Sequence, residues 1–181
     1  MTSRRRRVVA LPESPARPQR FAAHGRPFAA TLPDAVLATA VALGVRAGRN
    51  ETGGVILGRY APAHDCAEIH ELLPPPAGSH ATPTSFYRGT DGLFALLQDR
   101  WRAGIYYLGE WHSHPFAAPT PSAADIAQIQ SIATDPRYRC PEPLLLILGA
   151  DLRKAPRIGV HVCPRGGRLL HLQPDRMTEP V

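Results

Sequence analysis

Residues 109–125 carry the segment Gly-Glu-Trp-His-Ser-His-Pro-Phe-Ala-Ala-Pro-Thr-Pro-Ser-Ala-Ala-Asp. His112 and His114 are two residues apart at the predicted end of a strand, so both side chains leave the same face of that strand. If Ser122 caps the following helix, Asp125 lies in its first turn, where the proline-rich loop can return it to the histidines. Two histidines and one aspartate, with water as the fourth ligand, are typical of a catalytic rather than a structural zinc site.

Each part of this segment also has a simpler explanation. Ser122 and Asp125 match a helix capping box, which needs no metal, and a His-x-His pair occurs in many folds. A cupin would have a glutamate a few residues after the pair, whereas the next one is Glu142. A metallo-β-lactamase would continue with Asp-His, whereas Pro115 and Phe116 follow. Amidohydrolases need a full barrel of about 250 residues, which the length of the chain excludes.

The length and composition indicate one soluble globular domain. The chain has 181 residues, of which 44% are hydrophobic and 20% are charged, as is usual for globular proteins. The predicted order of elements mixes hairpins with helices, which favours an α+β fold with antiparallel strand pairs. Helices are predicted over 34–48, after an N-cap at Thr90 with Leu93, Phe94, Leu97 and Trp101 on one face, and over 122–133. Strands are predicted over 51–60, 66–73, 105–112, 144–148, 157–162 and 168–172, and a loop over 77–85.

The positive charge lies in the N-terminal tail. Residues 1–26 contain seven arginines and one glutamate, and so account for the whole net charge of +6. We expect residues 1–26 to be a disordered Arg/Pro-rich tail, 27–173 to be the folded domain and 174–181 to be a C-terminal tail. Since the rest of the chain is neutral, its charge argues against a nucleic-acid-binding domain. A non-catalytic module that binds nucleic acid through the arginine tail is the most distant alternative.

The sequence predicts no membrane insertion, and we expect a cytoplasmic protein. The apolar run after the first arginines, 8–11, is shorter than a signal peptide needs, and the run at 144–148 is far below a membrane span. The three cysteines, Cys66, Cys140 and Cys163, form no C-x-x-C pair, so we expect reduced thiols. Cys140 lies between loop prolines and is predicted to be the most exposed of the three.

The segment that begins at His112 resembles the signature of the JAMM (MPN-plus) zinc metallopeptidases. That family has a glutamate in an early strand, then His-Ser/Thr-His-Pro, and then seven residues before Ser-x-x-Asp. Here Glu51 opens Glu-Thr-Gly-Gly, residues 112–115 are His-Ser-His-Pro, and seven residues separate His114 from Ser122. Asp125 completes the match, and the resemblance covers residues 28–172. It implies a mixed, largely antiparallel curved sheet flanked by helices.

The resemblance also implies a role for each matching residue. His112, His114 and Asp125 would bind one Zn²⁺ per chain, with water as the fourth ligand. Glu51 would act as general base and later protonate the leaving amine, and Ser122 would hydrogen-bond the oxyanion. The chemistry is consistent, because zinc lowers the pKa of bound water to about 7.

Glu-Thr-Gly-Gly together with Gly-Glu-Trp-His-Ser-His-Pro is similar to a bacterial branch of the family, associated with ubiquitin-like conjugation and antiphage operons. That likeness implies a ubiquitin-like protein, or its conjugate, as substrate, and homologues of ubiquitin-activating and ubiquitin-conjugating enzymes as partners. Residues 77–89 are a candidate lip for an extended substrate tail. The main alternative is a peptidase that processes a sulfur-carrier protein with a Gly-Gly terminus.

Glu110 is a further candidate. It precedes His112 by two residues and should point to the same face of the strand. We expect its carboxylate either to hydrogen-bond and orient an imidazole that binds the metal, or to act as an alternative base.

Overall fold

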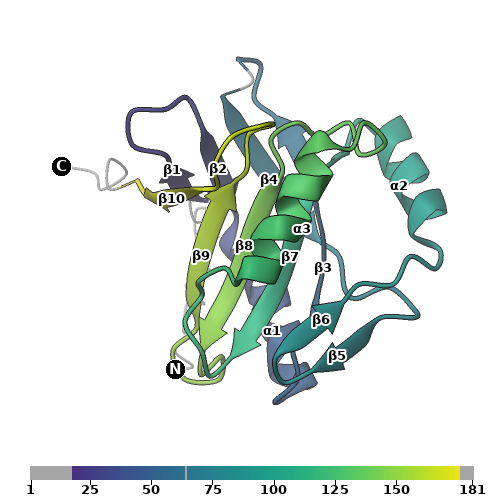
Figure 1. Ribbon diagram of the computed structural model, residues 1–181, viewed down its shortest axis with the longest axis vertical. Coiled ribbons are helices and arrows are strands. Elements are labelled where there is room, and N and C mark those ends of the chain that lie inside the picture. Colours follow the sequence, from purple (N-terminus) through teal and green to yellow (C-terminus); the bar gives the residue numbers. More distant parts are fainter. Residues whose placement is uncertain (1–17, 64, 176–181) are drawn as a thin grey trace, which may run out of the picture.

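The computed structural model describes residues 18–63 and 65–175 of the chain. These residues form one α+β unit with ten strands and three helices (Figure 1). The strands are β1 (Gln19–Ala22), β2 (Ala29–Leu32), β3 (Gly53–Tyr60), β4 (Cys66–Leu72), β5 (His80–Thr82), β6 (Ser85–Tyr87), β7 (Tyr106–Pro115), β8 (Leu144–Ala150), β9 (Arg157–Val162) and β10 (Leu170–Pro174). The helices are α1 (Asp34–Ala47), α2 (Leu93–Arg102) and α3 (Ala123–Thr134). None of these helices is both long enough and apolar enough to cross a membrane.

Eight of the strands form one mixed sheet in the order β1-β10-β9-β8-β7-β3-β4-β2, which closes into a barrel. The β2–β4 and β7–β8 pairs are parallel, and the other pairs in the barrel are antiparallel. The predicted mixed, largely antiparallel sheet is therefore confirmed. Its curvature runs to full closure, which the sequence did not indicate, because β1 joins β2 to β10.

Strand β1 corrects the predicted domain boundary at residue 26. Residues 19–22 pair with β2 and β10, and Phe21 is buried in the main core. Arg20, also on β1, adds an ion pair, since its Nε lies 3.1 Å from Asp175 Oδ2. Four residues are too short to show a hydrophobic period, so only tertiary pairing reveals this strand. The first seventeen residues of the expected tail, and 176–181 at the other end, lie outside the described residues.

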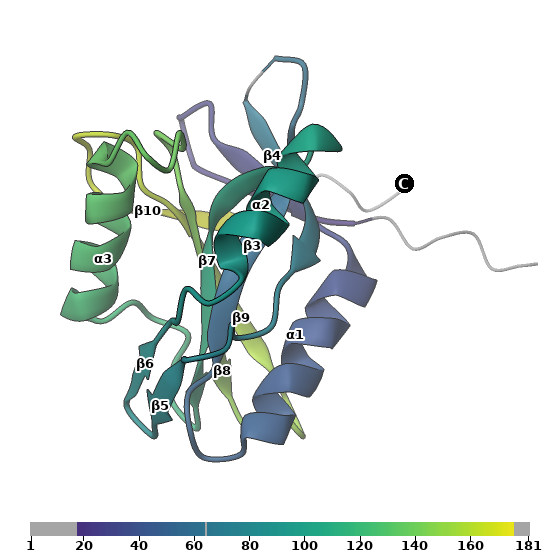
Figure 2. The same ribbon diagram turned by 90° about the vertical axis from the view of Figure 1, so that its right-hand side faces the viewer.

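Strand β8 explains why Leu144–Leu148 is continuously apolar. Leu144, Leu146 and Leu148 face the main core, which α1 covers. Leu145 and Ile147 face the other side, where they pack against α3. Figure 2 shows α1 and α3 on opposite sides of this wall of the barrel. A strand that is covered on both faces has no polar alternation, as in the parallel sheets of α/β proteins.

Three local predictions in residues 77–102 are wrong. The predicted loop at 77–85 overlaps the hairpin of β5 and β6, and among the described residues these two strands pair only with each other. Helix α2 begins after Gly92, which adopts a left-handed conformation (φ 71°), and not after a side-chain cap at Thr90. Its predicted apolar face is also divided, because Leu93 is buried whereas Phe94 and Trp101 are exposed. Short strands with exposed, polar residues carry too little periodicity to predict.

Cys140 is buried, which contradicts its predicted exposure. Its sulfur lies 3.7 Å from the hydroxyl of Tyr60, on β3. Burial raises the pKa of the Cys140 thiol to about 11, so the thiol is protonated at neutral pH and is a poor nucleophile. The neighbouring prolines correctly indicated a loop, but they did not indicate that the Cys140 side chain in it is buried.

An irregularity in β7 determines which side chains share a face near its end. Gly109 has φ 146°, and a Cβ there would lie 2.0 Å from the carbonyl oxygen of Leu144. The pairing with β3 shifts register at this point, as in a β-bulge. Residues three apart normally point to opposite faces of a strand. Here the extra residue brings Tyr107 and Glu110 together, with the Tyr107 hydroxyl 2.8 Å from Glu110 Oε1.

Candidate metal centre

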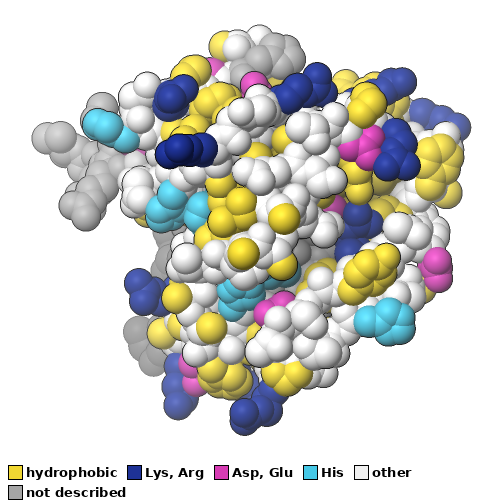
Figure 3. Space-filling model, in the orientation of Figure 1, with side chains coloured by type: hydrophobic (Ala, Val, Ile, Leu, Met, Phe, Trp, Pro, Cys, Tyr) yellow, Lys and Arg dark blue, Asp and Glu magenta, His cyan; other side chains and the backbone are white. Residues whose placement is uncertain are grey.

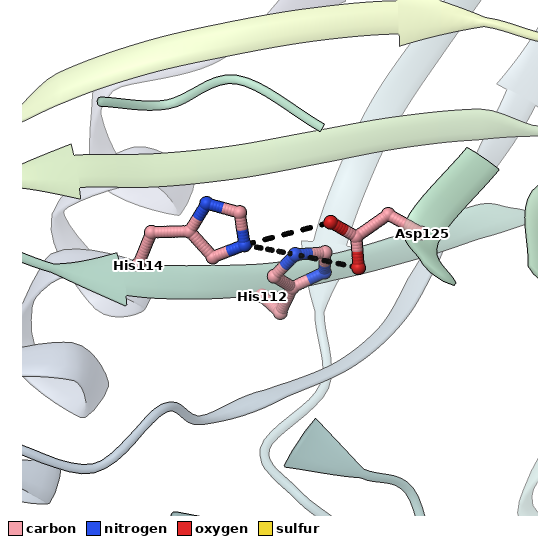
Figure 4. A group of neighbouring side chains, drawn as sticks. All are labelled: His112, His114 and Asp125. Carbon is pink, nitrogen blue, oxygen red and sulfur yellow. Dashed lines mark hydrogen bonds and ion pairs between the residues drawn. The ribbon is translucent and has the colours of Figure 1, made fainter. Parts of the chain in front are cut away.

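His112 and His114 lie at the carboxyl end of β7 and point to the same side of the strand, as predicted (Figure 4). Their Nε2 atoms are 3.0 Å apart, and their ring planes meet at 47°. The Nδ1 of His114 faces the carbonyl oxygen of Ala118 at 3.4 Å. A carbonyl can only accept, so Nδ1 is the donor in this contact, which leaves Nε2 as the nitrogen that can give up its proton and bind a metal. Figure 3, in the orientation of Figure 1, shows histidine and acidic side chains next to one another in a hollow near the centre of the visible face of the molecule.

Asp125 reaches the histidines from the first turn of α3. Its Oδ1 lies 3.4 Å from His112 Nε2, and its Oδ2 lies 3.6 Å from His114 Nε2. The capping box is present as well: Ser122 N donates to Asp125 Oδ2 at 2.7 Å, and Asp125 N donates to Ser122 Oγ at 3.2 Å. The capping and metal-site interpretations are therefore compatible, because the cap orients the carboxylate that faces the imidazoles.

The loop between Pro115 and Ser122 turns back closely over β8. Phe116 adopts a left-handed conformation (φ 63°), and its N–H donates to Ala150 O at 3.1 Å. Gly149 is the neighbour of His114 on β8. A Cβ at Gly149 would lie 2.6 Å from Ala117 O, so a larger residue would push the loop outward. This close crossing brings α3 to the histidines.

Glu51 approaches the site from the residues just before β3. Its side chain is buried, with Oε1 at 3.9 Å from His114 Nε2. Burial raises the pKa of Glu51, and the nearby imidazoles of His114 and His112 oppose that rise. The adjoining backbone is fixed to β7, since Thr52 N donates to Ser113 Oγ at 3.1 Å and Ser113 N donates to Thr52 O at 2.8 Å. The carboxylate is thus held beside the histidines by the segment that leads into β3, and not by their own strand.

The donor atoms of His112, His114 and Asp125 all lie within 4.8 Å of one another. Ligands at 2.0–2.1 Å from a tetrahedral zinc are roughly 3.3–3.4 Å apart, which is close to the separations of the three donors. Burial would raise the pKa of Asp125, but hydrogen bonding to His112 and His114 outweighs it and holds that pKa well below its usual range. An ionised carboxylate and two imidazoles are the donor set of a metal centre with one open position.

Glu110 lies beside this centre, but its carboxylate is bound elsewhere. Arg88 Nε lies 2.8 Å from Glu110 Oε2 and 3.1 Å from Oε1, and the Tyr107 hydroxyl donates to Oε1. The predicted contact with an imidazole is therefore replaced by an ion pair with Arg88. Sequence reasoning missed Arg88, which is 22 residues before Glu110, because no local spacing joins the two.

A large hollow lies away from this centre. It has a volume of about 960 Å³ and is bounded by α2, the start of β7 and residues 137–142. Its walls include Trp101, Tyr106 and Tyr138 but no histidine and neither Glu51 nor Asp125. The convergence of donor atoms, and not the size of a cavity, locates the candidate chemistry.

Comparison with known proteins supports this interpretation. A model of the prokaryotic homologues of the JAB domain matches residues 33–159. The chain is 38% identical over 153 residues to a protein named CD-NTase/cGAS isopeptidase from Enterobacter hormaechei, covering 84% of this chain and 85% of the relative. It is 28% identical over 102 residues to a protein of Sinorhizobium fredii named "Probable metalloprotease y4qB", covering 54% of this chain and 62% of the relative.

A solved structure supports the fold. The solution structure of a protein from Desulfitobacterium hafniense matches with a TM-score of 0.56 and 22% identity, covering 77% of this chain and 86% of that one. The family model spans most of the folded residues, including Glu51, both histidines and Asp125. The chain therefore belongs to the family of prokaryotic JAB-domain homologues, and its resemblance to the JAMM proteins is confirmed.

Proposed function

We propose that this chain is a zinc-dependent isopeptidase that cleaves after the C-terminus of a ubiquitin-like protein, in a conjugate or in a precursor. The observation that carries the proposal is the convergence of His112, His114 and Asp125 with the buried carboxylate of Glu51 3.9 Å from His114. The relatives named isopeptidase and metalloprotease support a peptidase role for the family. The donor set supports zinc as the metal.

His112, His114 and Asp125 would hold the ion. When bound, zinc supplies Lewis-acid chemistry, which polarises a carbonyl and acidifies water. Glu51 takes the proton of the attacking water and returns it to the leaving amine, and the rise of its pKa on burial suits a group that must do both. The Ser122 hydroxyl accepts from Asp125 N, and we assign its O–H as a donor to the oxyanion.

The hairpin of β5 and β6 is a suitable lip for the substrate tail. These two strands pair only with each other, so each has an outer edge at which an extended peptide can add a strand. Glu51 N donates to Thr82 O, on β5, at 2.8 Å, which places the hairpin beside the proposed base. A flexible C-terminal tail of a ubiquitin-like protein matches such an edge.

The relative named CD-NTase/cGAS isopeptidase favours removal of a ubiquitin-like protein from a conjugate over processing of a sulfur carrier. A nucleotidyltransferase of the CD-NTase class, joined to a ubiquitin-like protein through an isopeptide bond, is therefore the substrate to test first. The ubiquitin-activating and ubiquitin-conjugating enzyme homologues that would make the conjugate are the proposed partners.

Glu51→Gln tests the proposal. The variant should retain zinc and lose roughly the 10²–10⁴-fold that general-base catalysis supplies, measured as cleavage of a purified conjugate. Glu68→Gln, on β4 and outside the site, is the matched control and should cleave at the parent rate. Full activity of the Glu51→Gln variant would show that Glu51 is not the general base. Zinc loss in that variant would make Glu51 a ligand instead.

A further inference from the structure

Arg88 and Glu110 form a buried ion pair outside the metal-ligand set. The side chains of Arg88 and Glu110 are only 9% and 10% exposed, and one guanidinium nitrogen contacts both carboxylate oxygens. Arg88 also donates from Nη1 to Gly89 O at 3.2 Å. A pair taken out of water is tolerated only when its geometry is good and its other polar atoms are bonded. This pair is costly to break, because one charge would remain buried alone.

Another arginine–glutamate pair among the described residues serves as a reference. Arg100, on α2, contacts Glu71, on β4, at 2.9 and 3.2 Å. Both of these side chains are 39% exposed, so water replaces the contact easily. Burial therefore distinguishes the pair beside the metal centre from an otherwise similar pair on the surface.

The buried pair joins the hairpin to the strand that carries the histidines. Arg88 follows Tyr87, the last residue of β6, and Glu110 precedes His112 by two residues on β7. Ser79 closes the base of the same segment, because its Oγ accepts from Gly89 N at 2.9 Å and donates to Pro76 O at 2.6 Å. The hairpin is thus fastened to β7 at the point where its second strand ends.

Two further contacts link the hairpin to the site. Glu51 N donates to Thr82 O, and Phe86 packs against Gly53, where a Cβ would lie 2.9 Å from the ring. Gly53 is the partner of His112 across the β3–β7 pair. Any outward movement of the hairpin would therefore disturb the backbone of Glu51 and expose the surface beside His112.

We propose that Arg88 and Glu110 are positioning residues, which lock the β5–β6 hairpin against β7 and so hold both the substrate edge and the Glu51 backbone in place. The inference rests on the proposed function, in which the hairpin receives the substrate tail. Neither residue touches the reacting atoms. The lock acts through the hairpin, so its loss affects an extended protein substrate while the three metal ligands stay in place.

The test compares Arg88→Ala and Arg88→Lys with the matched control Arg100→Ala, which breaks the exposed pair. Arg88→Ala should retain full zinc, speed amide hydrogen exchange over residues 77–89, and raise KM for a ubiquitin-like conjugate by about 10–10²-fold, because small misplacements are costly. Arg88→Lys keeps the positive charge but loses the planar guanidinium with its Nε and Nη1 donors, so it should recover part of this effect. Arg100→Ala should leave all three readouts at their parent values.

The charge-swapped double variant Arg88→Glu with Glu110→Arg keeps the test decisive if Arg88→Ala does not fold. Relative to each single substitution, the double variant should recover hairpin protection. Unchanged exchange over 77–89 and an unchanged KM in a folded Arg88→Ala would overturn the proposal. So would loss of zinc, which would show that the pair supports the ligands instead of the hairpin. If the parent protein cleaves no conjugate, the proposed function fails, and hydrogen exchange alone still decides whether the lock exists.

Discussion

Two histidine pairs in this molecule have the same separation but different surroundings. The ring centroids are 4.8 Å apart both in His112–His114 and in His161–His171. The first pair is two residues apart on one strand and faces Asp125. The second pair faces across β9 and β10 with its rings stacked at 23°. Proximity of two imidazoles is therefore not enough to define a metal centre; a carboxylate must complete it.

The surroundings also shift the pKa of one histidine in each pair, in opposite directions. Hydrogen bonding to Asp125 is the main cause that raises the pKa of His114. Burial, together with His171, lowers the pKa of His161 to about 4. The Nδ1 of His161 is buried and has no hydrogen-bond partner among the described residues, whereas His171 Nδ1 accepts from Gln173 at 2.7 Å. His161 therefore stays neutral at neutral pH, and a buried neutral histidine is a structural residue.

The largest difference between the pairs should appear on substitution by alanine. His114→Ala should bind less than about a tenth of an equivalent of zinc and lose activity, because one of three protein ligands is missing. His171→Ala should retain about one zinc per chain and the parent rate. Metal analysis after dialysis against a weak chelator, with a cleavage assay, checks both variants. Equal zinc loss in the two variants would contradict the assignment of the metal centre to the first histidine pair alone.

Removal of β1 should destabilise the side of the barrel that carries the second histidine pair, because β1 pairs with β10, the strand of His171. A chain that starts at residue 25 loses Phe21 from the core and leaves the edge of β10 unpaired. Its free energy of unfolding should fall by at least the roughly 3–5 kcal/mol of a large core truncation. A chain that starts at residue 18 should unfold and cleave as the parent does, because the charged tail alone is missing. Urea denaturation measures the difference, and equal stability of the two truncations would show that β1 is dispensable.

The pH dependence of stability should identify His161. Its pKa is about 4 in the folded state and near 6.5 when unfolded. The unfolded chain therefore binds the extra proton first, and stability falls as pH drops from about 6.5 to 4, by at most about 1.4 kcal/mol per unit. His161→Phe should remove this slope, whereas the exposed His70→Gln should keep it. Identical slopes for parent and His161→Phe, from denaturation at several pH values, would contradict the assignment.

The smallest predicted effect concerns the helix cap that orients Asp125, the carboxylate that faces His112 and His114. Ser122→Ala removes the cap that orients Asp125 and should cost about 0.5–2 kcal/mol of stability. Ser122→Thr keeps a capping hydroxyl and should cost less. Ser131→Ala, on the exposed side of α3, is the control and should change stability by less than about 0.5 kcal/mol. Thermal unfolding of the metal-free proteins compares the three, and a harmless Ser122→Ala would mean that the cap does not support Asp125.

The sequence predicted the parts of the fold and site that depend on local pattern. Helix α3 and its cap at Ser122, strand β9 over 157–162 and both histidines of β7 lie where spacing placed them. The buried run at 144–148 was also recognised, since a doubly covered strand must be apolar throughout. By contrast, β1, β2 and the hairpin carry only three or four residues each, too few for a period to emerge.

The amino-acid sequence by itself determined the chemical identity of the centre: two imidazoles on one strand face, a carboxylate in a helix cap eleven residues after the second imidazole, and a glutamate beside glycines. Tertiary structure decided what surrounds it. The ion pair of Arg88 with Glu110, the depth of Cys140, the closure of the barrel by β1 and the neutrality of His161 all depend on contacts between residues far apart in the chain. Local spacing is set by backbone geometry, whereas burial and long-range pairing exist only after the chain has folded.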